Sequence, residues 1–235
     1  MNKQGNTYTV IYSVLLVLIV GVVLSLVYQA LRPTQEKNIA DDTKKQILAA
    51  ARIFPQDGES ISELYERYII KSYIVNSEGK VIDSDKPAFS VNMAEQVKLP
   101  DSERELPVYE CKTDEGLKYI LPVYGAGLWG PIWGYVAFDD NGDTIYGAYF
   151  AHQGETPGLG AEIEKPAFSD QFEGKHVFNA EEQFTSIAVI KAGQSAHGSD
   201  YVNAVSGGTI TSQGVQKMLK NSLEPYAAFL LNLKK

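Results

Sequence analysis

The chain has 235 residues, a formal net charge of −8 and a single cysteine. The acidic balance, with Lys and Arg scattered among Asp and Glu, argues against a nucleic-acid-binding protein. The lone Cys111 excludes an internal disulfide and a thiolate metal site, and its strand-like neighbourhood predicts a half-buried structural thiol. Beyond the first thirty or so residues, the length suits one domain of about two hundred residues.

The N-terminal region contains an uncharged apolar run. No charged residue lies between Lys3 and Arg32, and residues 10–27 are almost wholly apolar, which is long enough to cross a hydrocarbon core of about 30 Å. The run is too long for a cleaved signal peptide, so it predicts a retained transmembrane helix. The expected division is an anchor over residues 1–33 and a soluble domain over residues 34–235. Charge counts leave the orientation open, because long domains translocate largely regardless of flanking charge.

Two helices and a hairpin are expected in the first part of the soluble domain. Residues 41–54 predict a helix that an Asp-Asp-Thr sequence caps at its start, and residues 60–70 predict a second helix. Residues 72–75 and 80–82 predict a β-hairpin across an Asn-Ser-Glu-Gly turn.

Short β-rich runs dominate from residue 107 onward, and the tight turns between them predict antiparallel pairing. Asn141 and Gly142 form the strongest hairpin signal, and they favour a turn over a calcium loop because Thr144 and Phe150 occupy positions that need Gly and Glu. The predicted strands cover residues 107–111, 117–124, 132–138, 144–152 and 184–190. The expected fold class is α+β, with one N-terminal transmembrane helix followed by one antiparallel-sheet domain flanked by helices.

Two further helices are expected after the main strands. Residues 161–172 predict a short helix that Pro166 interrupts, and the C-terminal helix contains Pro225 as a kink or break. The C-terminal helix is expected to begin near Thr211 or Ser212, where a hydroxyl can cap it, because apolar residues recur from Val215 at steps of three and four.

A glycine-rich turn precedes this last helix. Residues 205–212, Val-Ser-Gly-Gly-Thr-Ile-Thr-Ser, run from an apolar residue through two glycines into the helix start. Exposed backbone N–H groups in such a turn, together with the positive end of the helix, suit a phosphate group. The same pattern is also typical of an ordinary turn without a ligand, so the residues alone leave both interpretations open.

Two other glycine-rich segments are also relevant. Residues 125–130, Gly-Ala-Gly-Leu-Trp-Gly, match a dinucleotide-binding pattern, but the β-rich run from Pro131 excludes the helix that such a site requires. Residues 152–160, His-Gln-Gly-Glu-Thr-Pro-Gly-Leu-Gly, predict an ordered turn at the end of a strand. The three histidines lack metal-ligand spacing, so no metal site is expected.

Together these segments resemble one known family. Residues 127–130, 155–160 and 206–211 lie behind a single anchor in the order found in the C subunits of bacterial sodium-translocating NADH:quinone oxidoreductases, and the resemblance covers nearly the whole chain. Two positions depart from it, since Gly208 stands where the family usually has Ala and Asn203 where it usually has Asp. The G subunits of Rnf ferredoxin:NAD complexes share the anchor, the loop and the threonine, and are the alternative.

The resemblance implies a site for FMN, held covalently through a phosphoester to Thr209. The polar residues Glu155 and Thr156 would reach the ring or the ribityl chain, and Leu159 would cover an apolar face. Trp129 would lie close to the flavin, although a tryptophan that fills the core is an equally simple alternative. The implied cofactor-binding residues are Trp129, Glu155, Thr156, Leu159, Gly160, Ser206, Gly207, Gly208 and Thr211.

The resemblance also implies a function. The protein is expected to relay electrons through FMN as a membrane-anchored subunit of a sodium-translocating NADH:quinone oxidoreductase, with the other subunits of that complex as partners. A flavin transferase that works outside the cytoplasm would modify Thr209, which implies a periplasmic domain on the bacterial inner membrane. The alternatives are an Rnf-type G subunit and a membrane-anchored sensor whose glycine-rich turn holds a free phosphate ligand.

Overall fold

The computed structural model describes residues 5–234. The chain divides into two compact units, Met1–Thr43 and Lys44–Lys235. The first unit is helical, and the second contains the sheets and the other helices. The expected division after residue 33 stays a prediction, because the chain continues through that point as one helix.

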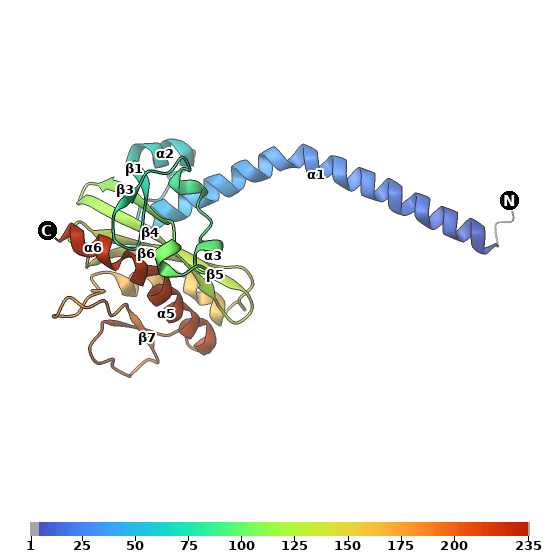
Figure 1. Ribbon diagram of the computed structural model, residues 1–235. Coiled ribbons are helices and arrows are strands. Elements are labelled where there is room, and N and C mark those ends of the chain that lie inside the picture. Colours follow the sequence, from blue (N-terminus) through green and yellow to red (C-terminus); the bar gives the residue numbers. More distant parts are fainter. Residues whose placement is uncertain (1–4, 235) are drawn as a thin grey trace. The chain divides into compact units, whose positions relative to one another are not determined.

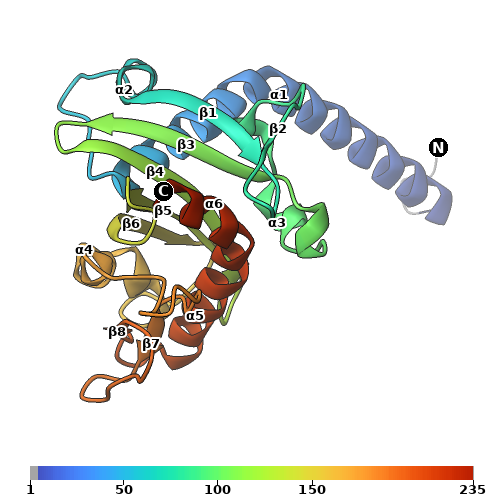
Figure 2. The same cartoon turned by 60° about the vertical axis from the view of Figure 1, so that its left-hand side comes forward.

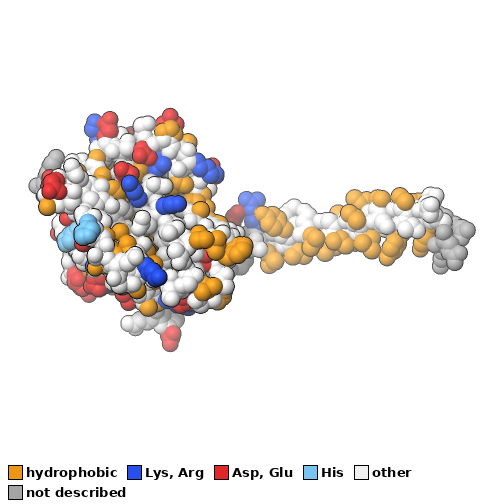
Figure 3. Space-filling view, turned by 90° about the horizontal axis from the view of Figure 1, so that it is seen from below, with side chains coloured by type: hydrophobic (Ala, Val, Ile, Leu, Met, Phe, Trp, Pro, Cys, Tyr) orange, Lys and Arg blue, Asp and Glu red, His pale blue; other side chains and the backbone are white. Residues whose placement is uncertain are grey.

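That helix, α1 (Asn6–Ala50), has 45 residues (Figure 1). Residues 10–27 are exposed on every side, and Figure 3 shows hydrophobic side chains along the helix. By length and composition α1 can cross a membrane. The separate helix expected to start with a cap at residues 41–43 is wrong, because α1 runs through these residues unbroken. An ion pair between Arg32 and Glu36, one turn apart, supports the helix there.

The end of α1 also differs from the prediction. The helix stops at Ala50 rather than Phe54, because Arg52 adopts a left-handed backbone conformation with φ of 61°. Glycine is the residue that usually adopts this conformation. The guanidinium of Arg52 forms an ion pair with Glu173, so the residue at the helix end also contacts a distant segment.

A six-stranded antiparallel sheet forms the centre of the second unit, with the strand order β2-β1-β3-β4-β5-β6 (Figures 1 and 2). Its strands are β1 (Ile69–Val75), β2 (Val81–Ile82), β3 (Leu106–Thr113), β4 (Gly116–Ala126), β5 (Pro131–Asp139) and β6 (Ile145–His152). Successive side chains enter opposite faces, so Val108 and Tyr109 lie in different hydrophobic clusters. Gly142, with φ of 66°, lies in the turn between β5 and β6, which confirms the predicted hairpin and the antiparallel fold.

A second, smaller sheet was not expected. β7 (Ala188–Ile190) and β8 (Tyr201–Asn203) pair in parallel, so only part of the strand predicted over residues 184–190 is present. Ser186 has φ of 59°, and this left-handed conformation prevents an extended strand from passing through it. The glycine-rich turn at residues 205–212 comes directly after the short strand β8.

Helices cover both faces of the sheet (Figure 2). α5 (Thr209–Leu223) and α6 (Ala227–Leu233) pack on one face. The last turns of α1 and α2 (Ile61–Tyr68) pack on the other face. α2 is shorter than predicted because Ile69 already begins β1.

Pro166 and Pro225 both lie at helix ends. The helical segment predicted over residues 161–172 is present in three pieces, a 3-10 turn over Gly160–Glu164, α4 (Pro166–Ser169) and a 3-10 turn over Asp170–Phe172. The predicted interruption is confirmed, and α4 begins at Pro166 because the first helical position needs no N–H donor. Pro225 lies between α5 and α6, which confirms the predicted break. A further short helix, α3 (Met93–Gln96), lies in the segment between β2 and β3.

α5 begins at Thr209, two residues before the earlier of the predicted starts, Thr211 and Ser212. Its N-cap residue is Gly208, and no side chain caps the helix. The expected hydroxyl cap is wrong because the hydroxyls of Thr211 and Ser212 bond to groups outside the helix. Thr209 therefore occupies the first turn of the helix.

Cys111, on β3, has no exposed surface, so the expectation of a half-buried thiol is wrong. Burial raises the pKa of this thiol to about 12, against a smaller opposing effect of Lys118. At neutral pH the side chain is therefore protonated and packs as a small apolar group.

The packing of α1 predicts where the chain can be shortened. A chain that begins at Thr34 keeps the buried end of α1 and is expected to fold without detergent. A chain that begins at Ile53 loses Ile47 and Leu48, which have no exposed surface, and each such loss costs about 2–5 kcal/mol. The free energy of unfolding of a domain is only about 5–15 kcal/mol. The shorter chain is therefore expected to lose its cooperative thermal transition, as measured by circular dichroism. Equal melting temperatures, or aggregation of the Thr34 chain, would contradict this prediction.

Candidate functional site

Three segments meet at one end of the large sheet. Ala126 pairs with Pro131, and Ile132 pairs with His152, so the β4–β5 turn and the loop after β6 leave the sheet at the same end. α5 packs closely against this end, because a Cβ on Gly214 would overlap the carbonyl oxygen of Ala126. The sequence motifs at residues 127–130, 152–160 and 205–212 lie on these three segments.

Glu155 joins the three segments. Its side chain is only 4% exposed. Its Oε1 accepts a hydrogen bond from the N–H of Trp129 at 2.8 Å, and its Oε2 accepts one from the hydroxyl of Thr211 at 2.5 Å. Its own N–H donates to Nδ1 of His152 at 3.1 Å. Glu155 therefore has partners within the protein at both carboxylate oxygens, whereas the resemblance implied that it reaches the flavin.

Two glycines leave the space that this carboxylate fills. A Cβ on Gly160 would overlap both the carboxylate of Glu155 and the hydroxyl of Thr211, and a Cβ on Gly127 would overlap the same carboxylate. The need for glycine at these positions is therefore explained by the packing around Glu155.

The start of α5 suits an anion. Thr209 is the first residue of the helix and its side chain is exposed. Gly208 provides no side-chain cap, and no acidic residue lies in the first turn. The first N–H groups of a helix have no partner within the helix, and the helix dipole adds positive potential there. A phosphate group next to Thr209 would therefore be stabilised.

The four hydroxyl groups of this segment differ in their exposure to solvent. Thr211 and Ser212 are each 1% exposed, and Ser212 accepts a hydrogen bond from the N–H of Val205 at 3.0 Å. Ser206 and Thr209 are exposed. Solvent access thus leaves these two hydroxyls open to modification, and Thr209 is the one within the helix turn.

Large apolar side chains around these segments are exposed. The exposed fractions are 47% for Leu128, 68% for Trp129, 43% for Leu159 and 55% for Ile210. The alternative that Trp129 fills the core is therefore wrong. Leu159 lies over Gly207, where an added Cβ would be 2.6 Å from its Cδ2 atom. Exposed apolar side chains next to an anion-binding turn suit a ligand with a flat ring and a phosphate.

Sequence reasoning missed Leu128 and Ile210. The signal for Ile210 was its phase, because it lies off the helical stripe of buried residues that includes Val215 and Met218. A single exposed apolar residue at the start of a helix does not indicate a ligand site. It becomes informative only when apolar residues of neighbouring segments are exposed beside it.

The remaining implied residues lie in the same loops. Thr156 is exposed, and its carbonyl oxygen accepts hydrogen bonds from the N–H groups of Leu159 and Ala161. Gly207 is exposed and has φ of 74°, which favours glycine. No group of three His, Cys, Asp or Glu side chains that could hold a metal occurs among residues 5–234.

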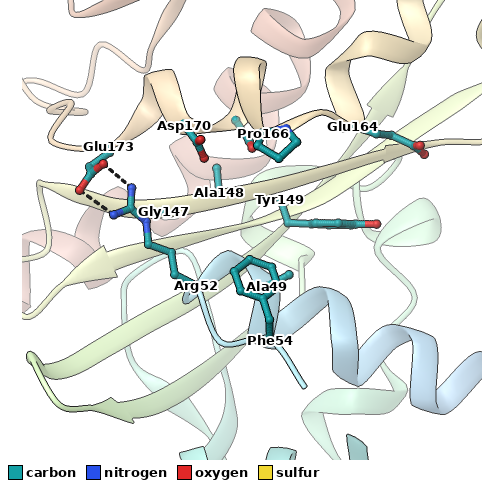
Figure 4. Close-up of a pocket in the computed structure, with 11 residues that line it drawn as sticks. Ala49, Arg52, Phe54, Gly147, Ala148, Tyr149, Glu164, Pro166, Asp170 and Glu173 are labelled. Atoms are coloured by element: carbon teal, nitrogen blue, oxygen red, sulfur yellow. Dashed lines mark hydrogen bonds and ion pairs between the residues drawn. The ribbon is translucent and has the colours of Figure 1, made fainter. Parts of the chain in front are cut away.

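A cavity of about 460 Å³ lies elsewhere, between the end of α1, β6 and the segment after it (Figure 4). Arg52 and Glu173 on its wall face each other. Their hydrogen bond raises the pKa of Arg52 and lowers the pKa of Glu173. The cavity contains none of the residues implied for the cofactor, and its cationic wall residue already has a partner. The candidate site is therefore the end of the sheet near Thr209.

Comparison with a known protein family gives independent information on these segments. A family model described as an FMN-binding domain matches residues 127–224. The match starts in the β4–β5 turn and ends just after α5. It therefore contains all three segments that meet at the candidate site.

Comparisons with individual proteins cover most of the chain. The C subunit of the Na(+)-translocating NADH-quinone reductase of Vibrio anguillarum is 34% identical over 230 residues, which are 92% of this chain and 89% of that protein. The crystal structure of the C subunit from Parabacteroides distasonis has a TM-score of 0.78 and 44% identity, and covers 85% of this chain and 96% of that one. The crystal structure of NqrC from Shewanella oneidensis has a TM-score of 0.69 and 27% identity, over 83% and 97% of the two chains.

The packing around Glu155 predicts the effect of a substitution in the loop. Gly160→Ala is expected to lower the free energy of unfolding by about 1–3 kcal/mol, because the new methyl group displaces a buried carboxylate. The matched control is Gly154→Ala in the same loop, where an added Cβ meets no atom within 4 Å, so a change below about 0.5 kcal/mol is expected. Urea unfolding measures both. Equal effects of the two substitutions would contradict the close packing at Gly160.

Proposed function

We propose, because this chain belongs to the C-subunit family of the Na(+)-translocating NADH-quinone reductases, that it holds FMN covalently at Thr209 and relays electrons in such a complex. The family membership and the FMN-binding domain make the chain a membrane-anchored flavoprotein subunit of that enzyme. The covalent bond and the electron relay are the new steps of the proposal. Its partners are the other subunits of the complex and a flavin transferase.

The observation that carries the proposal is the start of α5. Thr209 has an exposed hydroxyl in a helix turn that no side chain caps. The N–H groups of this turn would hold the phosphate, while Thr209 would provide the covalent bond. The fit extends to the exposed side chains of Trp129 and Leu159, which offer apolar surface for the flavin ring.

Attachment of FMN is a group transfer that balances with FAD as the donor. The Oγ atom of Thr209 would bond to the phosphorus on the riboflavin side of FAD, while the phosphoanhydride bond breaks and AMP leaves. The hydroxyl proton of Thr209 is lost, so the protein gains the mass of one FMN less one water. No electron is transferred in this step, and the bond needs no oxidant.

The residues of the chain then hold and orient the cofactor. Bound FMN supplies one-electron chemistry between neighbouring redox centres. Thr209 prevents loss of the cofactor, and the N–H groups of α5 fix its phosphate. Leu159 and Trp129 would offer apolar surface to the ring and would limit the directions in which it can lie.

The alternatives named from the sequence have less support. Membership in the C-subunit family favours the sodium-translocating enzyme over an Rnf-type complex. The match to an FMN-binding domain favours a flavin over a free phosphate ligand in a sensor. No feature of the described residues favours either alternative over the main proposal.

We also propose that α1 crosses the bacterial inner membrane with the second unit on the periplasmic side. The apolar segment of α1 supplies the membrane span. The argument for the side is that the transferase that would modify Thr209 works outside the cytoplasm in this family. An exposed Thr209 is compatible with access by a second protein.

The attachment site is tested by substitution. With the transferase coexpressed, the full-length protein is expected to show ultraviolet fluorescence in a denaturing gel and the mass gain of one FMN less water. Thr209→Val is expected to abolish both, because the isosteric side chain has no hydroxyl. Ser206→Ala is the matched control, since it removes the other exposed hydroxyl of the turn, and should leave both signals unchanged. A fluorescent band that persists in Thr209→Val would refute the assignment.

The orientation is tested by reporter fusion. Alkaline phosphatase joined to the C-terminus is expected to be active, because this enzyme matures only outside the cytoplasm. A fluorescent protein that folds only in the cytoplasm is the paired control and should stay dark. The reverse pattern would place the second unit in the cytoplasm and would remove the proposed route of flavin attachment.

A further inference from the structure

The inference concerns Glu155, a buried carboxylate between the segments of the site. The side chain is 4% exposed, and its two oxygens accept from donors on two other segments, the N–H of Trp129 and the hydroxyl of Thr211. Its backbone is tied to His152 at the end of β6. One residue therefore connects the β4–β5 turn, the loop after β6 and the first turn of α5.

The surroundings are built to accept this carboxylate. Gly127 and Gly160 lie so close to it that a methyl group on either would overlap a carboxylate oxygen. Thr211 is 1% exposed, so its hydroxyl is also shielded from water. Because the backbone of both glycines packs directly against the carboxylate, the side chain of Glu155 has little freedom to move, and its contacts are specific in position.

The burial is costly and is compensated locally. Among residues 5–234, the ion pairs that the structure contains do not include Glu155. A buried carboxylate without a cation is unfavourable unless strong hydrogen bonds replace water. The two donors do so, and the positive end of α5 lies next to the second of them, because Thr211 is in the first turn of the helix.

We infer that Glu155 is a positioning residue of the cofactor site rather than a ligand of the flavin. Through Thr211 it fixes the helix turn that carries Thr209, and through the backbone of Trp129 it fixes the exposed indole. This inference rests on the proposed attachment of FMN to Thr209 for its functional meaning. It goes beyond that proposal by assigning the residue that aligns the attachment point with the surface for the ring.

The first experiment needs no flavin. In the full-length protein in detergent, Trp133→Phe leaves Trp129 as the single tryptophan of the two in the chain. Glu155→Ala in this background is expected to lower the fluorescence anisotropy of Trp129 and increase its quenching by acrylamide, because the indole's backbone loses its anchor. Glu162→Gln is the control in the 3-10 turn that follows the loop, where Glu162 accepts from the N–H of Gly158 at 3.0 Å, and should change neither signal.

The second experiment measures the rate of FMN attachment by the transferase with FAD. Glu155→Ala is expected to slow attachment about tenfold or more, since small misplacements of a reacting group reduce rates strongly. Thr211→Val removes only the hydroxyl that Glu155 holds, and should slow attachment in the same way. The double variant should be no slower than the slower single variant, because Thr211 acts through its contact with Glu155.

Rescue by a conservative variant separates positioning from loss of folding. The amide of Glu155→Gln can accept from the N–H of Trp129 and donate to the oxygen of Thr211, so attachment within about threefold of the unsubstituted rate is expected. Circular dichroism and the melting temperature identify any variant that has unfolded. If Glu155→Ala unfolds, Thr211→Val and Glu155→Gln still decide the question.

The outcomes distinguish the inference from the proposed function. Slow attachment in Glu155→Ala with normal attachment in Thr211→Val and an unchanged Trp129 signal would overturn the inference, and would indicate direct contact between Glu155 and the flavin. Normal rates in both variants would overturn it as well. If even the unsubstituted protein takes up no flavin, the proposed function fails, while the Trp129 measurement still tests Glu155.

Discussion

The hydrogen bonds of Glu155 are the interaction on which the geometry of the candidate site depends. The three segments that meet there are far apart in the sequence, and the sheet brings only two of them to the same end. The contact at 2.5 Å between Glu155 and Thr211 adds the start of α5 to this pair. A charged hydrogen bond in a water-poor setting is stronger than a neutral one. The glycines around it, Gly127 and Gly160, follow from the same constraint.

A second constraint links the anchor to the domain. The last turns of α1 contribute Ile47 and Leu48 to the hydrophobic cluster on one face of the sheet, and Trp133 on β5 donates a hydrogen bond to Gln46 at 3.0 Å. The helix that contains the membrane span therefore also supplies core residues of the second unit. Hence the membrane segment and the folded domain share one continuous backbone element, and the domain cannot be separated from α1 at its last turns without loss of core packing.

The sequence was informative where a pattern depends on local chemistry. The Asn141-Gly142 turn, the short β-rich runs and the apolar run of α1 each have a local physical cause, and each was predicted. The errors occurred where contacts between residues far apart in the sequence determine where a helix begins or ends. The start of α5 moved to Thr209 because Thr211 bonds to Glu155, which lies 56 residues earlier in the chain. Likewise α1 continued through residues 41–43, where a local Asp cap competes with tertiary burial of the following turns. The exposure of Trp129 was also undecided by the sequence, because the residues of a turn do not indicate which distant segments that turn packs against.

The openness of the site is a physical argument for the proposed covalent bond. Pockets that hold a cofactor without a bond usually enclose most of its surface, whereas here Thr209 and the apolar side chains of Trp129, Leu159 and Ile210 are exposed. A ligand resting on such a surface would gain little from burial and would still lose its translational freedom. The proposed bond to Thr209 would offset the lost translational freedom once, at the time of attachment, and would leave the flavin ring uncovered. An uncovered ring could approach a redox partner closely, so the exposure that makes reversible binding weak would also favour the proposed electron exchange between proteins.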